Sequence, residues 1–391
     1  MIKKINTLRL FILLGFLINY FPVTSQIIFN NNGGDLEWSN AANWSANVPN
    51  GQQARTKFNV GGTINVSANI TVDQMQFPDA GAVVNTFGGP GSITMTGYNT
   101  TQSLQTNKIG QTVTFNIPFT FDSRNNGVET FKFNKASAVL NFNRLFTVND
   151  EFVTSANHIE PNATQINFNH SLVGTGHVKF GSKSRPIFGA SYNGSNYNGI
   201  LKIGGGTGAA GVKLVSNVSD NGTFLKSGGV ISVINQGATI TINGANTLKG
   251  GIQTGNNTVG LIINKNQSAV GLITMGTGGI NLSADAAVTS VAFADNSGSS
   301  WGTGKITITG FADNEVSFGT DAAGLTPQQL AQITLNGSAV KINASGQIAV
   351  AGGGGGGNVV STFNNGGGDK LWSNDANWTN GVPNHEKAKA T

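Results

Sequence analysis

The stretch that organises the chain reads FNNNGGDLEWSNAANW at residues 29–44 and closes with VPN at 48–50. Near the end of the sequence it returns as FNNGGGDKLWSNDANW at 363–378 and closes with VPN at 382–384. Equivalent residues of the two copies are 334 positions apart throughout, so no insertion separates them. A motif repeated at this distance marks the start of a unit. We therefore expect the residues between the copies to form one such unit.

Residues 1–25 have the pattern of a signal peptide. Three cations precede an apolar run at 10–18, and small residues at 23–25 offer a cleavage site before Gln26. The rest of the sequence has no apolar run near the roughly 20 residues that a membrane-spanning helix needs. We therefore expect an exported protein, extracellular or on a bacterial outer surface, with no transmembrane segment in the mature chain.

Charge is scarce in this chain. Without the three signal cations, 20 basic residues remain against 18 acidic residues, a net charge of +2 that argues against a nucleic-acid partner. Charged residues make up 10% of the chain, glycine reaches 55 of 391 residues, and cysteine is absent. Glycine and β-branched residues are weak helix formers. The composition therefore predicts an almost all-β protein with a polar surface of Asn, Thr, Ser and Gly.

Short alternating runs follow one another through residues 63–300, which we expect to form coils. Runs such as Val113–Ile117 and Thr239–Ile242 alternate apolar and polar residues, as strands with one buried face do. Between 115 and 188 many apolar positions are Phe, which predicts an internal ladder of stacked rings. This rhythm fits a sandwich, a barrel or a β-helix. More than 230 residues without a helix signal or disulfide favour a solenoid that grows by adding coils.

Small capping elements are expected at both ends of the coils. The first motif lies in a predicted N-terminal cap at 26–62, and a predicted terminal cap at 301–351 contains a short helix signal. There Thr326 is the expected N-cap, Pro327 the first helical residue, and Gln329 the partner in a capping box. We expect this helix to follow the last coils and cover their open end, because uncovered edge strands expose unpaired backbone groups.

The remaining residues are expected to begin another unit. Residues 352–358 contain six consecutive glycines and predict a flexible linker. Residues 359–391 hold the second motif copy and are expected to be the start of a second, incomplete unit. Because no coils follow this copy in the sequence given, we expect it to be poorly packed and mobile.

At two places the chain resembles exported β-helix surface proteins with autotransporter-associated strand repeats, an adhesin- or passenger-like class. One is the Gly-Asp-x-x-Trp-Ser-Asn-x-x-Asn-Trp opening with its Val-Pro-Asn close. The other is a terminal block containing ITITGF at 306–311, FGTDAAGLT at 318–326, QLAQIT at 329–334 and GQI at 346–348. Together they cover under a third of the chain. The resemblance implies a right-handed parallel β-helix and a structural or adhesive role.

Candidates for catalysis are few. An enzyme on a β-helix would most plausibly be a polysaccharide lyase or glycoside hydrolase, which needs paired carboxylates or a metal-assisted base. The densest polar cluster comprises Asp150, Glu151, His158 and Glu160, with His170 and His177 after it. Loops or turns between coils explain these residues more simply. We therefore expect no enzyme activity, no catalytic residues, no metal site and no cofactor.

Two binding alternatives rest on side-chain oxygens. Asp35 and Asp220 lie in Asn- and Gly-rich stretches that offer further oxygen ligands for calcium, but a single carboxylate rarely supplies a site for an ion that takes six to eight oxygens. Thr-x-Thr pairs such as Thr239 and Thr241 resemble the hydroxyl arrays of ice-binding faces. Any strand with Thr on its outer side gives the same pattern.

Trp38 and Trp44 are the candidate ligand-binding residues, because an exposed aromatic face attracts the apolar face of a sugar ring. The interpretation that we favour is that both rings are buried and anchor a Gly- and Asn-rich turn, with each indole N–H bonded to a backbone carbonyl. We conclude from the sequence that the protein is a secreted or cell-surface structural or adhesive β-solenoid, with surface glycans or other cells as partners. The alternative is a carbohydrate-binding or polysaccharide-degrading β-helix protein.

Overall fold

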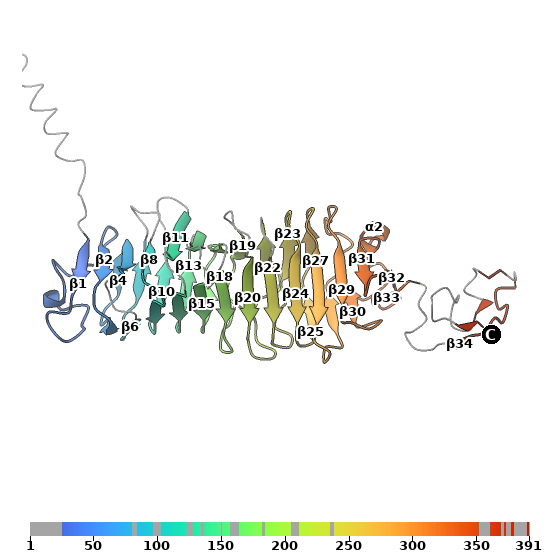
Figure 1. Ribbon diagram of the computed structural model, residues 1–391, viewed down its shortest axis with the longest axis horizontal. Helices are drawn as coiled ribbons and strands as arrows, with labels where there is room; N and C mark the ends of the chain where they lie inside the picture. The colour runs from blue at the N-terminus through green and yellow to red at the C-terminus, as the bar shows by residue number, and fades with distance from the viewer. Residues whose placement is uncertain are drawn as a thin grey trace, which may run out of the picture.

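The computed structural model describes residues 26–79, 84–96, 103–122, 128–133, 137–149, 151–156, 164–181, 184–204, 211–234 and 238–351, and, around the second motif, 360–368, 371–372, 377–378 and 389–390. Stacked parallel strands form a β-solenoid of about ten turns, and the strands succeed one another in chain order along an elongated rod (Figure 1). The expected all-β, parallel β-helix architecture is therefore confirmed. The expected signal peptide at 1–25 and the expected linker at 352–358 lie outside the described residues.

Two long sheets form two sides of the rod. The 11-stranded sheet has the order β1 (Ile27–Phe29), β2 (Arg55–Phe58), β5 (Gln74–Phe77), β8 (Leu104–Thr106), β11 (Val128–Phe133), β14 (Glu151–Ala156), β17 (Val178–Phe180), β19 (Ile200–Ile203), β21 (Val230–Val233), β23 (Gly251–Thr254) and β26 (Ile273–Met275). The 14-stranded sheet has the order β3 (Gly62–Asn65), β6 (Val84–Gly88), β9 (Thr112–Phe115), β12 (Val139–Phe142), β15 (Thr164–Phe168), β18 (Ser184–Phe188), β20 (Val212–Ser216), β22 (Ala238–Ile242), β24 (Val259–Ile263), β27 (Ile280–Ala284), β29 (Ile306–Thr309), β31 (Ile333–Leu335), β32 (Ser338–Ile342) and β33 (Ile348–Val350).

Shorter sheets complete the coils. One has five strands, β4 (Ile70–Val72), β7 (Ile93–Met95), β10 (Phe119–Phe121), β13 (Phe146–Val148) and β16 (Leu172–Val173). Another has three, β25 (Gln267–Val270), β28 (Val291–Phe293) and β30 (Val316–Phe318). From β3 to β18 the chain visits the 14-stranded, the 5-stranded and the 11-stranded sheet in turn, so each of these coils has three sides. A separate pair, β34 (Val360–Ser361) and β35 (Lys389–Ala390), lies in the second motif region.

The alternation in the sequence becomes an alternation between core and surface. In β22 and β24 the first, third and fifth residues are buried, and the residues between them are partly exposed. Parallel pairing stacks like residues on like, as in the buried column Leu214, Ile240, Leu261, Leu282 and Ile308. Because a shift of one residue would turn this column outward, the buried face fixes the register of the coils.

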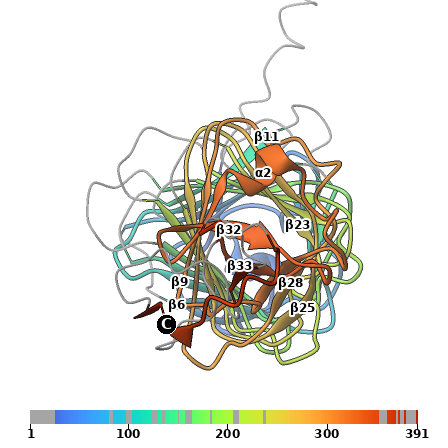
Figure 2. The same cartoon turned by 90° about the vertical axis from the view of Figure 1, so that its right-hand side faces the viewer.

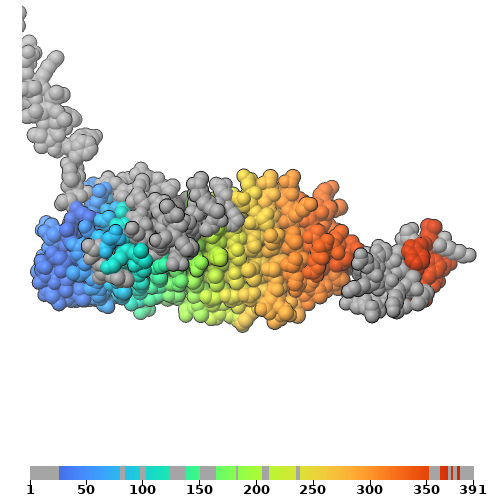
Figure 3. All heavy atoms as spheres, viewed as in Figure 1, coloured from blue at the N-terminus to red at the C-terminus, as the bar shows by residue number. Residues whose placement is uncertain are grey.

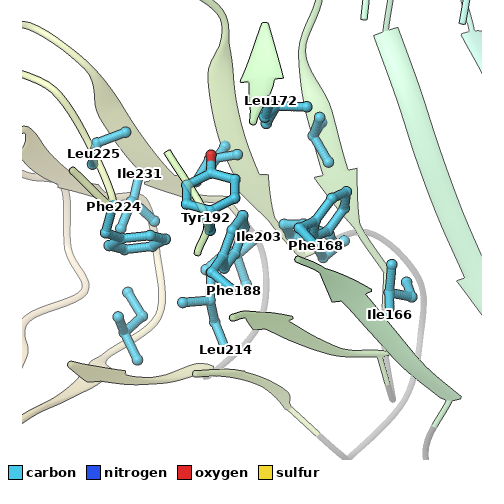
Figure 4. Packing of buried hydrophobic residues seen from close by; sticks show 14 of the residues in the cluster. Ile166, Phe168, Leu172, Phe188, Tyr192, Ile203, Leu214, Phe224, Leu225 and Ile231 are labelled. Carbon is cyan, nitrogen blue, oxygen red and sulfur yellow. The ribbon is translucent and has the colours of Figure 1, made fainter. Parts of the chain in front are cut away.

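The predicted phenylalanine ladder is present. One column on the 14-stranded sheet contains Phe87, Phe115, Phe142, Phe168 and Phe188, whose successive ring centroids are 5.2, 5.5, 5.6 and 5.1 Å apart with nearly parallel planes. Figure 4 shows where the ladder ends: Phe188 meets Tyr192 and Phe224, and aliphatic side chains fill the core beyond them. Side chains of the Phe residues in β11 lie outside the described residues.

The structure corrects the predicted limits of the coils. The first rungs lie inside the segment predicted as an N-terminal cap, because β1 and β2 already pair in parallel within the 11-stranded sheet. At the other end β29, β30 and β31 continue the parallel rungs into the segment predicted as a terminal cap. The predicted boundaries lie too far inward because the end strands are identified as rungs by their pairing with strands that are distant in the sequence.

The described residues contain only two short helices, η1 (Ala41–Asn43) and α2 (Pro327–Leu330). Neither these nor any other described segment forms a helix long and apolar enough to cross a membrane. The start of α2 is as predicted: Thr326 Oγ1 accepts from Gln329 N (3.2 Å), and Gln329 Oε1 accepts from Thr326 N (2.8 Å).

The predicted position of α2 as an end cap is wrong. The helix lies between β30 and β31, within the last coil, and Figure 2 shows it at the rim of the rod while β32 and β33 lie across the centre of the end. Gln329 Nε2 donates to Asn296 O (2.7 Å) and Ser299 O (3.0 Å), which ties the helix to the preceding coil. The antiparallel strands β32 and β33 close the end instead, because reversing direction stops the parallel stack.

Candidate functional site

Trp38 and Trp44, the residues singled out for ligand binding, lie inside the N-terminal end of the rod. They are 1% and 5% exposed, and their rings meet edge to face with centroids 4.8 Å apart. The Trp38 indole donates to Pro49 O (3.1 Å), and the Trp44 indole donates to Trp38 O (2.7 Å). Burial and these two hydrogen bonds confirm the anchoring interpretation. Sugar stacking on either ring would require the motif to open.

Asp35 and Asn43 form the polar centre of the motif. Asn43 Nδ2 donates to Asp35 Oδ1 (2.6 Å) and Glu37 O (2.9 Å), and Asn40 Nδ2 donates to Asp35 Oδ2 (2.7 Å). The Glu37 backbone N–H and these two amides lower the pKa of the Asp35 carboxyl. Asn43 Oδ1 accepts from Gly33 N (2.8 Å). A Cβ atom at Gly33 would lie 2.5 Å from the Asn40 amide and 2.7 Å from Asn43 Oδ1, so a larger residue there would displace these hydrogen-bonded side chains.

The motif also covers the free edges of three sheets. In the 14-stranded sheet, Trp38 N donates to Asn65 O on the first strand, β3 (2.9 Å). In the 11-stranded sheet, Ser45 N donates to Ile28 O on β1 (2.8 Å). In the 5-stranded sheet, Asn50 Oδ1 accepts from Thr71 N on β4 (2.9 Å). An uncovered edge would present unpaired backbone groups to other chains. The motif is therefore the N-terminal cap of the solenoid, and its Asn50 explains the end of the Val-Pro-Asn close.

The contacts of the two aspartates do not support the calcium alternative. Both carboxylate oxygens of Asp35 accept hydrogen bonds from N–H donors. A cation bound to these oxygens would face the positive ends of those N–H groups. Asp220 accepts from Ala245 N (2.9 Å) and from the Lys265 ammonium (2.9 Å), and these two groups lower its pKa. In the described part of the chain, no three His, Asp or Glu residues come together as a metal site.

The polar cluster considered for catalysis is described only in part. Asp150, His158 and Glu160 lie outside the described residues, and Glu151 is described only as the first residue of β14. Of the two later histidines, His170 is exposed, and His177 Nδ1 accepts from Ile200 N (3.1 Å) in a connection between coils.

The outer side of the 14-stranded sheet carries almost no charge. We call the outward residues of its strands β3 to β31 the neutral face. Arg185 and Lys213 are the charged residues among them, and most of the others are Thr, Asn, Gln or aliphatic residues. Asn141 Nδ2 donates to Thr114 Oγ1 (3.0 Å), and its Oδ1 accepts from Asn167 Nδ2 (2.6 Å), so neighbouring rungs hold each other's side chains. With strands about 4.8 Å apart, the face presents uncharged hydrogen-bonding groups on β9 to β15 and again on β22, β27 and β29. The outward residues of β18, β20 and β24 interrupt this array, because they are charged, aliphatic or Gly.

Sequence reasoning missed the asparagine ladders beside this face. An Asn directly follows many strands of the 14-stranded sheet, and its side-chain amide bonds to the equivalent Asn of the preceding coil. The pairs are Asn143 with Asn116 (2.8 Å), Asn169 with Asn143 (2.8 Å), Asn243 with Asn217 (2.7 Å) and Asn264 with Asn243 (2.7 Å). The signal was visible as an Asn at the end of successive alternating runs, which also marks where the coils repeat.

Two adjoining hollows of about 430 Å³ each lie near the last rungs of the 11-stranded sheet. They share Ser227, Gly271 and Ala294. The first contains Leu272, which is 51% exposed, and the second is lined by Lys249, Asp295 and Asp321 among others. Together they form a concave region of the described surface with both apolar and charged groups. Figure 3 shows the rod on which they lie, coloured along the chain.

The acids of the second hollow are engaged in turns. Asp295 Oδ1 accepts from Ser297 Oγ (2.7 Å) and Ser297 N (2.8 Å), and these bonds lower the Asp295 pKa. Asp321 Oδ1 accepts from Ala323 N (2.8 Å). A general acid working near neutral pH needs a raised pKa. The lowered pKa therefore argues against Asp295 as a general acid.

Comparisons with family models, with curated proteins and with solved structures found no match to this chain. The resemblance to exported β-helix surface proteins thus depends on the two sequence signatures alone.

Proposed function

We propose that the protein is an exported β-solenoid of the cell surface or extracellular space, with a structural or adhesive role and no catalytic activity. The neutral face carries this proposal. Its uncharged hydroxyl and amide groups, repeated at the strand spacing, match the hydroxyl groups of neutral glycans on surfaces or other cells. Hydrogen bonds between uncharged groups are little affected by salt, so such adhesion would persist at high ionic strength.

The closed ends of the rod support the structural part of the proposal. The first motif covers the sheet edges at one end, and β32 and β33 close the other. A solenoid closed in this way presents its sides for contact and keeps its ends from pairing with other chains. Side contacts along a rod suit a spacer or an adhesive shaft.

The test is adhesion of protein-coated beads to glycan-coated surfaces and to cells. Three lysines placed on the neutral face, by Asn141→Lys, Thr241→Lys and Thr307→Lys, are expected to reduce bead retention several-fold at high and low salt. A matched variant carries three lysines on the outward positions Gln76, Gln105 and Ser232 of the 11-stranded sheet, which do not line either hollow. This control is expected to retain the beads as the unmodified protein does.

Two results would contradict the proposal. Equal retention by the two lysine variants would mean that the neutral face does not mediate adhesion. Release of sugar fragments from a polysaccharide, abolished by Asp150→Ala or Glu151→Ala, would establish an enzyme instead. Fractionation of the producing cells tests export separately, since a protein found only in the cytoplasm would contradict the surface role.

The two hollows favour a second candidate function, a carbohydrate-binding module. Leu272 offers an apolar contact for a sugar ring, and Lys249 and Gln253 offer hydrogen-bond donors around it. A glycan array would distinguish the two: Leu272→Asp would abolish binding in the hollows and leave binding by the neutral face unchanged.

A further inference from the structure

The described part of the second motif copy has the same local structure as the first. Asn377 Nδ2 donates to Leu371 O (2.9 Å), its Oδ1 accepts from Gly367 N (2.8 Å), and the Trp378 indole donates to Trp372 O (2.8 Å). The equivalent bonds of the first copy are 2.9, 2.8 and 2.7 Å long. Even the left-handed residue recurs, since φ is 55° at both Asn31 and Asn365. The motif therefore takes up its hydrogen-bonded form in both places.

The second copy also repeats the first rung of the solenoid. β34 pairs with β35 in parallel, with Val360 opposite Lys389. β1 pairs with β2 in parallel, with Ile27 opposite Thr56. The partners are 29 positions apart in both pairs. Because register decides which side chains face the core, the second copy begins a coil in the same register as the first.

The two copies differ in what covers them. Trp38 is 1% exposed, whereas the equivalent Trp372 is 57% exposed. Beyond its own motif, Trp38 packs against Phe58 on β2 (5.8 Å between centroids) and Phe87 on β6 (6.4 Å). Leu371, beside Trp372, is 56% exposed. Leu371 stands where the first copy has Glu37, a half-buried acid that accepts from Asn65 Nδ2 (2.6 Å). The apolar surface that is covered in the first copy and exposed in the second is therefore that of the leading tryptophan, and Leu371 adds to it.

We propose that the exposed ring of Trp372, with Leu371 beside it, is the seat for the first rungs of another β-solenoid, which joins at β35 in the register of β2. The occupant has inward aromatic residues on its first and second rungs, as Phe58 and Phe87 are in the first unit. The motif is then a joint that closes off one solenoid from the next and sets the register of the coil that follows. This proposal concerns assembly and stands whether or not the neutral face is adhesive.

The test extends the full chain beyond Thr391, which is equivalent to Lys57, by a second copy of residues 58–351. The chain is labelled with 5-fluorotryptophan, and the Trp372 resonance is assigned with Trp372→Phe. Solvent exposure is measured by acrylamide broadening of this resonance. In the extended chain we expect the sensitivity of Trp372 to acrylamide to fall several-fold, to the level of Trp38.

The matched control has one additional glycine between Thr391 and the same extension. This insertion turns the following strand residues to the opposite faces, so Trp372 is expected to stay accessible. Continued accessibility of Trp372 in the in-register chain, or equal protection in both chains, would overturn the proposal. If Trp372 of the unextended chain becomes protected as the protein concentration rises, the surface is one for self-association and the proposal is overturned. If soluble glycans protect Trp372, the surface is a ligand site, which would also overturn the proposal.

Discussion

The phenylalanine ladder should contribute more to stability than the same number of isolated buried rings. Phe142 contacts four rings, those of Phe115, Phe119, Phe146 and Phe168, at centroid distances between 4.3 and 5.6 Å. Phe293 is equally buried but contacts one ring, that of Phe318, at 5.0 Å. The two positions therefore allow the same substitution to be compared in different aromatic surroundings.

Replacement of Phe by Ala in a core destabilises a protein by about 3–5 kcal/mol. An aromatic pair contributes about 0.5–1.5 kcal/mol beyond its buried area, so three additional pairs amount to about 1.5–4.5 kcal/mol if they add. Contacts that share one ring do not add fully. We therefore expect Phe142→Ala to lower the free energy of unfolding by about 2 kcal/mol more than Phe293→Ala does.

Guanidinium unfolding followed by circular dichroism measures this difference. Because coils of a solenoid can unfold separately, hydrogen exchange of β12 and of β28 should be followed alongside it. Phe142→Leu keeps most of the side-chain volume without the ring and should give an intermediate loss. Losses for Phe142→Ala and Phe293→Ala that agree within about 0.5 kcal/mol would refute the reasoning, because mutational free energies of independent sites add only to about that accuracy.

Two further predictions concern the N-terminal motif, and a third concerns the start of α2. The pKa of Asp35 is lowered in the folded motif, so the ionised carboxylate stabilises the motif above the ordinary pKa of 3.8. This stabilisation is lost as the pH falls through the lower pKa of the folded state. Acid should therefore increase acrylamide quenching of tryptophan in the native chain, whereas Asp35→Asn should show no such pH dependence from this site. Gly33→Ala should destabilise the cap by about 1–3 kcal/mol through overpacking, whereas Gly298→Ala, where a Cβ meets no atom within 4 Å, should be nearly neutral in thermal unfolding. Thr326→Ala removes the N-cap bond to Gln329 N and should cost about 1 kcal/mol; unchanged exchange of the α2 amides would contradict this.

Local pattern was sufficient for much of the fold. The alternation in runs such as Thr239–Ile242 predicted the strands, and the spacing of Phe predicted the ladder, because a strand has a side-chain period of two whatever its neighbours are. The N-cap at Thr326 was also predictable, since its bonds reach only three residues along the chain. Such features depend on residues close in sequence.

Features that join distant coils were not predictable in the same way. The helix α2 was placed at the end of the stack because nothing in its sequence shows that Gln329 reaches back to Asn296 and Ser299. The neutral face arises only when parallel register aligns Thr, Asn and Gln from many coils, and irregular coil lengths conceal that register in the sequence. The limits of the coils were misjudged for the same reason. A strand at either end is identified as part of a coil only by the distant strand with which it pairs.

The two tryptophan motifs separate these contributions. The internal hydrogen bonds of the motif follow from its own residues, because they recur with nearly equal lengths around Asn43 and Asn377. Burial of the leading tryptophan depends on the coils around it, since Trp38 is covered by Phe58 and Phe87 while Trp372 is 57% exposed. The hydrogen bonds join residues that are close in the sequence, whereas burial of an indole needs apolar side chains that only stacked coils bring to it.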